Sequence, residues 1–242
     1  MGFNLVAPST RGISLALSKH ILSKTTLPLL ATHRSPIFEA TTISSAATDI
    51  SRIYLLKLDF HNEESIRNAA AKAHDILLDN HKIENMIISP GILYPERKLE
   101  DLDYGQVLET FKTNIIGPMF MLKHFTPLLS PTSKTMIFAA RVGSVSDNRL
   151  GGWFSYRTSK AAVFQLVKTF NVYLRQKKLG FCIGYHPGTV KTDLSKDFWN
   201  SSKGIMKDVD EAAACAWEVL NGRTEREHSG RVFDWKGEEI LP

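Results

Sequence analysis

Two side chains capable of acid–base chemistry stand four residues apart in the stretch SYRTSKAAV (155–163), namely Tyr156 and Lys160. The stretch is expected to be helical, so both side chains should lie on one face about a turn apart. A tyrosine pKa near 10 is too high for proton exchange at neutral pH, and a nearby ammonium favours the phenolate and lowers that pKa. The pair predicts a general acid/base, Tyr156, tuned by Lys160. The same spacing also arises by chance, so the fold around it decides its meaning.

Short apolar runs alternate with amphipathic segments along the chain. Strands are expected at 3–6, 27–34, 53–59, within 85–93 (strand then turn), 134–140, 180–188 and 230–235. Helices are expected at 13–24, 62–80, 102–129 with an interruption near Gly117-Pro118, from 155 onward, and 209–222. This alternation predicts an α/β fold in one domain spanning 1–242, a doubly wound parallel sheet of about seven strands with helices on both faces. Ligands bind such folds beyond the carboxyl ends of the strands. The first loop, Tyr156 and Lys160 should all meet there.

The composition narrows the class of protein. The 242 residues are 43% hydrophobic and 23% charged, which suits one globular core. No apolar run approaches the roughly 18 residues of a membrane span. The scattered histidines show no ligand spacing, so no metal site is predicted, and Cys182 and Cys215 are expected as reduced thiols rather than a disulfide.

The net charge of +5 comes largely from the N-terminal segment. Residues 1–38 contain no acid but include Arg11, Lys19, Lys24 and Arg34. This concentration argues against a nucleic-acid binder. An acid-poor start is also typical of a mitochondrial transit peptide. Because the same residues are predicted to form strand, loop, helix and strand of the fold, a cytoplasmic protein is expected and a mitochondrial one is the alternative.

Five motifs, in this order, resemble those of the short-chain dehydrogenase/reductase family: PSTRGIS (8–14), SPGIL (89–93), Asn114 in FKTNIIGP (111–118), SYRTSK (155–160) and HPGTVKTDL (186–194). The sequence of residues 140–162, ARVGSVSDNRLGGWFSYRTSKAA, further resembles the C-factor-like branch of that family. The resemblance implies a Rossmann-like fold and hydride transfer between a nicotinamide cofactor and a carbonyl or secondary alcohol. It also implies a homodimer or homotetramer that uses the Asn114 and Tyr156 helices as contact surface.

The resemblance assigns further roles. Lys160 would hold the cofactor's ribose hydroxyls, and the Asn114 carbonyl would support a proton-relay water. The alternative for Asn114 is a residue that merely bends its helix. The cofactor-binding residues that the resemblance implies are Ser9, Thr10, Arg11, Gly12, Ile13, Arg34, Asp59, Ser89, Pro90, Gly91, Asn114, Tyr156, Lys160, Pro187, Gly188, Val190 and Thr192.

The first loop departs from the family pattern of Thr-Gly, three residues, Gly, any residue, Gly. Ala7 and Pro8 replace the first pair, Gly12 is kept, and Ser14 replaces the last glycine. Glycines there let the backbone approach a pyrophosphate at a helix N-terminus. The Ser9 and Thr10 hydroxyls are expected to compensate by bonding phosphate, and weakened cofactor binding is the opposite outcome. In SPGI, Ser89 and Pro90 likewise replace the family's central Asn and Ala.

The preferred cofactor is predicted from the end of the second strand. An NAD site needs a carboxylate there, whereas the strand ends in Thr32, His33 and Arg34. Arg34 and Arg11 offer guanidinium groups suited to a 2′-phosphate, which predicts NADP(H). Asp59 would by resemblance contact the adenine. The alternative is that both arginines are ordinary surface residues.

In the family, a serine just after the fifth strand donates a hydrogen bond to the substrate oxygen. In this chain that position is occupied by Ala139 and Ala140. Ser144 is the predicted substitute and Ser146 the second choice; the alternative is that Ser144 only ends a strand.

Residues 193–206, with Phe198 and Trp199, are expected to form a lid over a partly apolar small-molecule substrate. Trp153, Phe154 and Tyr94 would line the same cleft or belong to the core. A rival to the enzyme is a weakly catalytic cofactor-binding protein with a signalling or scaffold role.

Overall fold

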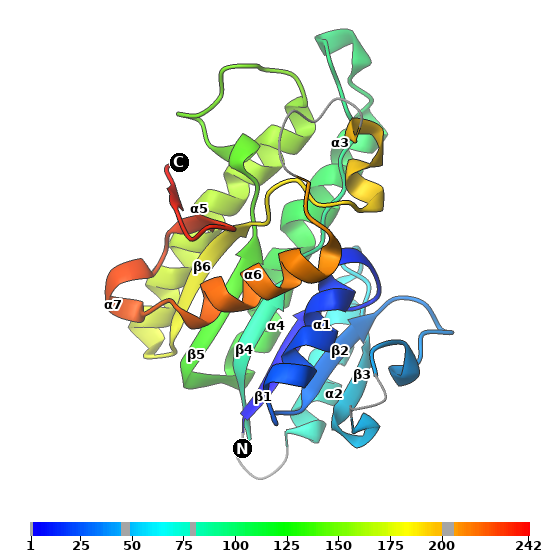
Figure 1. Cartoon of the computed structure of the whole chain (residues 1–242), viewed down its shortest axis with the longest axis vertical. Helices are drawn as coiled ribbons and strands as arrows, with labels where there is room; N and C mark the ends of the chain where they lie inside the picture. The colour runs from blue at the N-terminus through cyan, green and yellow to red at the C-terminus, as the bar shows by residue number, and fades with distance from the viewer. Residues whose placement is uncertain (1, 45–48, 78–80, 200–205) are drawn as a thin grey trace.

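The sheet runs through the centre of the molecule in the computed structural model, which describes residues 2–44, 49–77, 81–199 and 206–242, the Phe198 side chain excepted (Figure 1). Its strands lie in the order β3-β2-β1-β4-β5-β6-β7-β8, and all pair in parallel except β8, which runs antiparallel to β7. The strands are β1 (Gly2–Ala7), β2 (Leu29–His33), β3 (Ile53–Lys57), β4 (Lys82–Ile88), β5 (Leu129–Phe138), β6 (Phe181–His186), β7 (Val232–Asp234) and β8 (Glu239–Ile240). The predicted α/β class is confirmed.

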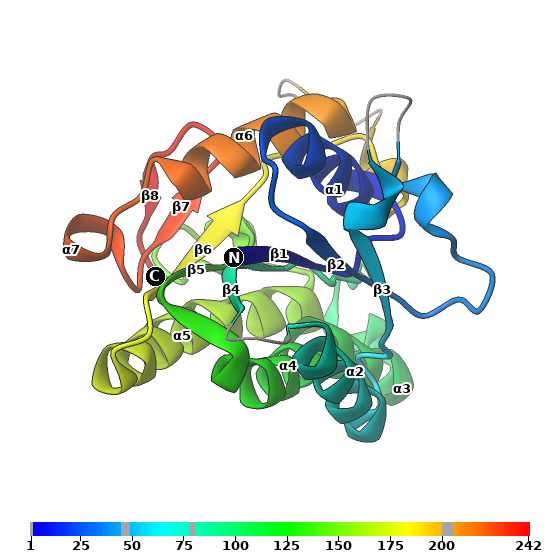
Figure 2. The ribbon, with the colours of Figure 1, turned by 90° about the horizontal axis from the view of Figure 1, so that it is seen from below.

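Helices cover both faces of the sheet, as Figure 2 shows from below. One face carries α2 (Glu63–Ile76), α3 (Tyr104–Phe111), α4 (Gly117–Phe125) and α5 (Phe154–Lys177), and the other carries α1 (Gly12–Lys24) and α6 (Val209–Asn221). The short α7 (Glu225–His228) precedes β7. Alternate strand residues enter two apolar clusters: Leu5 and Met86 pack on the α5 side, and Val6 and Ile87 on the α1 side. Burial on both faces explains why the strands read as continuous apolar runs.

One element departs from the expected set, and one expected interruption is confirmed. The two-residue β8 is not predicted, because a pair so short carries no alternation pattern; it follows a turn in which Gly237 adopts a φ of +83°. The helix expected at 102–129 is interrupted close to Gly117-Pro118, as predicted: it divides into α3, a π-helical turn at Lys112–Ile116, and α4. Pro118 lies just after this turn and has no N–H to continue the α-helical ladder.

Side-chain caps fix the helix starts. Asn62, the predicted cap of α2, accepts a hydrogen bond from the Ser65 N–H, and Asp103 and Asp208 cap α3 and α6 in the same way. Where α4 begins, a Cβ on Gly117 would come within 2.5 Å of the Phe60 carbonyl oxygen. Glycine therefore permits the close packing of α4 on the loop that follows β3.

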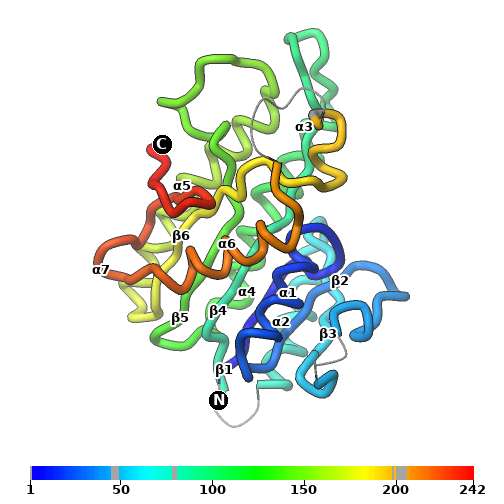
Figure 3. Tube along the Cα trace, viewed as in Figure 1, coloured from blue at the N-terminus to red at the C-terminus, as the bar shows by residue number. Residues whose placement is uncertain are grey.

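The trace in Figure 3 brings the C-terminal segment back toward the loop that follows β5. The Ser146 N–H donates to the Pro242 carbonyl oxygen at 3.3 Å, so the last described residue touches this loop. Within the described residues, no helix combines the length and apolar character needed to cross a bilayer. The segment resembling a transit peptide forms β1, α1 and β2 of the sheet.

Candidate active site

The predicted motifs meet at the carboxyl end of the sheet. A Cβ placed on Gly91, after β4, would lie 3.9 Å from Lys160 Nζ and 4.0 Å from Asn114 Oδ1. The loop after β4, the π-turn and the start of α5 therefore converge on one point. The other predicted cofactor residues lie at the same end: Thr10 in the loop after β1, Ile13 in the first turn of α1, Pro90 after β4, and Pro187, Gly188, Val190 and Thr192 after β6.

Tyr156 and Lys160 occupy the first two turns of α5, and both are buried. Lys160 Nζ donates a 2.8 Å hydrogen bond to the Phe138 carbonyl oxygen at the end of β5, and it lies 5.8 Å from the centroid of the Tyr156 ring. The ammonium is thus anchored to the sheet while it faces the tyrosine. This is the helical spacing predicted from the sequence.

The pKa values of this pair differ from the expectation. Burial raises the pKa of Tyr156 to about 12 and lowers the pKa of Lys160 to about 8. Desolvation penalises the charged form of each group, and it outweighs their mutual attraction. The predicted lowering of the tyrosine pKa is therefore corrected: in the protein by itself, Tyr156 is held as a neutral phenol.

Asn114 ties three parts of the site together. Its Nδ2 donates to the Ile92 carbonyl oxygen and to Ser159 Oγ, each at 3.0 Å, while its Oδ1 accepts from the Ile92 N–H at 2.9 Å. In a regular α-helix the Asn114 carbonyl would accept from the residue four positions later, which is Pro118. Because proline has no N–H, that carbonyl lacks its usual partner. Asn114 thus lies at the helix irregularity and also makes specific polar contacts.

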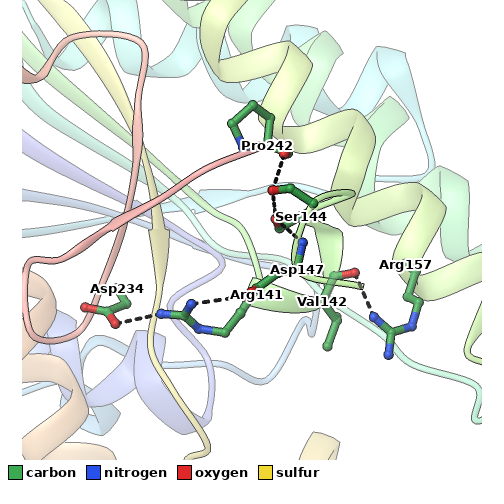
Figure 4. Close-up of polar contacts among 8 residues, drawn as sticks. Arg141, Val142, Ser144, Asp147, Arg157, Asp234 and Pro242 are labelled. Carbon is green, nitrogen blue, oxygen red and sulfur yellow. Dashed lines mark hydrogen bonds and ion pairs between the residues drawn. The ribbon is translucent and has the colours of Figure 1, made fainter. Parts of the chain in front are cut away.

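Ser144 is held in a local turn instead of facing an open site. It is buried, its Oγ accepts from the Asp147 N–H at 3.2 Å, and it lies 3.2 Å from Ser146 Oγ. Ser146 Oγ in turn donates to the Pro242 carbonyl oxygen at 2.7 Å (Figure 4). These contacts favour the structural alternative for Ser144, and they also occupy Ser146.

Two arginines, Arg141 and Arg157, hold the loop between β5 and α5 through ion pairs and hydrogen bonds. Arg141 bridges Asp147 and Asp234 with two 3.0 Å contacts, which links the loop to β7 (Figure 4). Arg157, one residue after Tyr156, donates to the Val142 carbonyl oxygen at 3.2 Å. The loop between β5 and α5 is therefore fixed to α5 and to the edge of the sheet.

The loop between β1 and α1 presents backbone N–H groups. Gly12 opens α1 with a φ of +54°, and among the described residues no side chain caps the helix at Arg11. The first turn contains no acid, so its N–H groups and positive dipole end have the chemistry that suits an anion. Thr192 Cγ2 would lie 3.5 Å from a Cβ on Gly12, so the loop after β6 borders this site.

The serines of this loop behave differently from the expectation. Ser9 is fully buried and donates to the Val6 carbonyl oxygen at 2.7 Å, so its hydroxyl belongs to the loop itself and not to a phosphate. Ser14, which stands at the last glycine position, lies 2.8 Å from Ser89 through their Oγ atoms. Two departures from the family pattern are thus partners in one hydrogen bond, and that bond joins the first turn of α1 to the loop after β4.

The charged residues predicted to read the nucleotide follow three neighbouring strands, β1, β2 and β3. Arg34 is exposed just after β2, and Arg11 lies 3.9 Å from Asp193 in an exposed ion pair. Asp59 Oδ1 accepts from the His61 N–H at 2.9 Å and so shapes the entry to α2. Both guanidinium groups are exposed to solvent and reachable by a ligand.

The aromatic residues expected near the substrate are only partly brought together. The Trp153 ring lies edge-on to Tyr156, with centroids 6.2 Å apart, and Phe154 is half-buried beside it. Tyr94 instead donates to Glu109 at 2.6 Å. In the expected lid, Trp199 Nε1 donates to Ser195 Oγ at 2.9 Å, while residues 200–205 and the Phe198 side chain lie outside the described residues.

Two residues near Tyr156 were missed by the sequence reasoning. Glu96 is 3% exposed; its carbonyl oxygen accepts from the Trp153 N–H at 2.6 Å, and its carboxylate accepts from Ser155 Oγ. His186 ends β6, and its Nδ1 is buried without a partner among the described residues. An acid in a loop and a histidine before Pro-Gly carry no pattern that predicts burial. The one available signal is that His186 opens the motif HPGTVKTDL (186–194).

Comparisons with known proteins agree with this geometry. Residues 4–203 match the family model described as short chain dehydrogenase. The chain is 30% identical over 162 residues to 1-hydroxy-2-glutathionyl-2-methyl-3-butene dehydrogenase of Rhodococcus sp. (strain AD45), which covers 63% of this chain and 70% of that protein. It is 29% identical over 174 residues to C-signal of Myxococcus xanthus, covering 69% and 91%.

Solved structures give the same result. An NADPH-bound carbonyl reductase from chicken fatty liver superposes with a TM-score of 0.85 at 25% identity, covering 99% of this chain and 98% of that one. The carbonyl reductase Sniffer of D. melanogaster has the same fold, with a TM-score of 0.87 at 23% identity over 100% of both chains. With its five motifs in place around Tyr156, the chain belongs to the short-chain dehydrogenase family of oxidoreductases.

Proposed function

We propose that this protein is an NADP(H)-dependent oxidoreductase that interconverts a small carbonyl compound and its secondary alcohol, with Tyr156 as general acid/base. The observation that carries the proposal is the convergence of Tyr156, Lys160 and Asn114 at the carboxyl end of the sheet. The similarity to an NADPH-bound carbonyl reductase supports this choice of cofactor and reaction.

The residues present fit a dinucleotide. The uncapped N-terminus of α1 suits its pyrophosphate, and the positive φ of Gly12 allows close backbone approach. Arg11 and Arg34 would bind the 2′-phosphate, and Lys160 the ribose hydroxyls. Gly188, with a φ of +77°, turns the loop after β6 toward this site. NADPH bound there supplies the hydride for reduction.

The side chains of this chain handle the proton. Tyr156 donates its phenolic proton to the carbonyl oxygen as the carbon is reduced, and its raised pKa keeps it protonated beforehand. The ammonium of Lys160 stabilises the phenolate that is left, because an opposite charge nearby favours the ionised form. The Asn114 carbonyl, which cannot accept a hydrogen bond from Pro118, would hold a water through which the tyrosine regains its proton.

A side-by-side titration with NADPH and NADH, followed by nucleotide fluorescence, tests the cofactor assignment. Tighter binding of NADPH is expected, because no carboxylate ends β2 to repel the 2′-phosphate. Equal binding of the two nucleotides would show that Arg11 and Arg34 do not recognise the 2′-phosphate. Binding of neither nucleotide would contradict the proposed function.

A second candidate, a cofactor-binding scaffold with little turnover, is favoured by one observation. Ala139 and Ala140 lack the family's hydroxyl, and Ser144 is engaged elsewhere. Tight NADPH binding without reduction across a panel of ketones and aldehydes would support the scaffold. The intact Tyr156, Lys160 and Asn114 support the enzyme, since a scaffold has no chemical need of all three.

The assembly and location stay predictions. A homodimer or homotetramer is supported by apolar side chains on α3 and α4, where Tyr104 is 83% and Met119 is 51% exposed. Sedimentation would show a mass twice or four times that of the chain. A single domain spanning 1–242 and a cytoplasmic rather than mitochondrial location complete the proposal.

A further inference from the structure

The proposed reaction leaves one hydrogen-bond donor unassigned, and this inference rests on that function. A carbonyl oxygen that gains negative charge is best stabilised by a second donor beside the acid, which is worth about 10² to 10³ in rate. Ala139 and Ala140 offer no hydroxyl, and Ser144 is held in its turn. The donor must therefore come from another element that reaches the end of β5.

The end of β6 lies directly beside this position. Phe138 of β5 pairs with Tyr185 of β6, and the Ala139 N–H donates to the Tyr185 carbonyl oxygen at 2.8 Å. Parallel strands advance together, so the next residue pair along the two chains is Ala139 and His186. His186 thus neighbours the position where the family's serine would stand.

The side chain of His186 is on the same face of the sheet as Tyr156. Successive side chains of a strand point to opposite faces. Tyr185 packs in the apolar cluster on the α1 and α6 side, whereas Cys182 packs in the cluster that contains Val163 of α5. His186 lies four positions after Cys182 in the same strand, an even number, so its side chain points to the same face as that of Cys182. This is the α5 side, where Lys160 donates to the Phe138 carbonyl oxygen.

The charged groups around His186 keep its imidazole neutral. Burial and the cations Arg141, Lys160 and Lys207 lower its pKa to about 4, against the opposing effect of Asp234. A neutral imidazole carries one N–H and one acceptor nitrogen. Because Nδ1 is enclosed in a residue that is otherwise half-buried, a ligand would meet the ring at Nε2.

We propose that His186 Nε2–H donates a hydrogen bond to the substrate's carbonyl oxygen, in the place that the family gives to a serine hydroxyl. In this step the hydride adds to the carbonyl carbon and the Tyr156 proton goes to the oxygen. His186 keeps its own proton and stabilises the charge that develops before proton transfer is complete. The carbonyl is reduced, and NADPH is oxidised to NADP⁺.

The test compares steady-state carbonyl reduction by wild type, His186→Ala and the double variant His186→Ala/Ala139→Ser. The single change should lower kcat by about 10² to 10³, with NADPH affinity unchanged. The serine should restore at least about tenfold, because it returns a donor to the same place. His124→Ala, on α4 beside Glu63, is the matched control and should keep wild-type kcat.

Each result bears on a distinct claim. A kcat for His186→Ala within about twofold of wild type would overturn the inference and leave the proposed function standing. A loss that Ala139→Ser fails to restore, with His186→Asn equally impaired and a lowered melting temperature, would assign His186 to structure and also overturn it. A wild-type protein that reduces no carbonyl would overturn the proposed function and this inference together.

Discussion

The loop between β1 and α1 and the start of α5 lie at the same end of the sheet, yet they tolerate change very differently. At the start of α1, which follows the loop directly, Ser14 stands where the family has glycine, and its hydroxyl is partnered by Ser89. At α5, Tyr156 and Lys160 keep their family identities. In the proposed function the loop and the start of α1 act through backbone N–H groups, which survive side-chain replacement, whereas α5 acts through the side chains themselves. Departure from a motif therefore matters most where the side chain does the chemistry.

The alanines after β5 sharpen this contrast. They lack the side-chain donor that the family has there, so the proposed function needs a donor from another side chain. The proposed donor, His186, lies at the end of the neighbouring strand β6. The first region thus has a hydrogen bond between two departures from the motif, and in the second the proposed replacement comes from another element.

Tyr156→Phe gives the largest expected effect. Loss of the hydroxyl removes the general acid, and the reduction rate should fall at least about 10³-fold. NADPH affinity should stay within about twofold of wild type, because the ring remains in place. Tyr173→Phe, an exposed position on the same helix, is the control and should change neither value. Full activity in Tyr156→Phe would contradict the claim that α5 acts through its side chains.

Lys160→Met tests the burial of the cation. The Lys160 pKa falls from an ordinary 10.5 to about 8, so above pH 8 the unfolded chain binds more protons than the folded protein. The free energy of unfolding should therefore rise by about 2 kcal/mol between pH 8 and pH 10 through this residue alone. Urea unfolding of both proteins at both pH values measures this. The free energy of unfolding of wild type, minus that of Lys160→Met, should show that rise. Parallel pH dependence in the two proteins would contradict the buried charge.

Arg34→Gln probes the nucleotide side. A guanidinium–phosphate contact is worth about 1.5 to 3 kcal/mol, so NADPH should bind about 10- to 100-fold more weakly while NADH affinity stays the same. Arg67→Gln, an exposed arginine on α2, is the matched control. An equal loss for both nucleotides would show that Arg34 does not read the 2′-phosphate.

Ser144→Ala should have the smallest effect. Its hydroxyl accepts from the Asp147 N–H within the turn, so kcat should stay within about threefold of wild type. A fall of 10² to 10³, measured under the same saturating conditions, would instead make Ser144 the oxyanion donor. That outcome would also remove the need for His186.

The sequence predicted the sheet and the proximity of Tyr156 and Lys160 because both depend on local patterns. Alternating apolar runs identify parallel strands, and a four-residue spacing identifies a shared helix face. The Ser14–Ser89 bond joins residues 75 positions apart, and no local pattern carries it. The direction of the Tyr156 pKa depends on burial, which spacing does not reveal. Glu96 and the face of His186 likewise follow from packing and strand register.

The most direct test of the account is isotope transfer from NADPH deuterated at the reactive C4 position. Wild-type protein should deliver one deuterium to the carbinol carbon of the alcohol, detected by mass spectrometry, and Tyr156→Phe should deliver almost none in the same time. An alcohol without deuterium, or equal transfer by the two proteins, would contradict hydride transfer assisted by Tyr156.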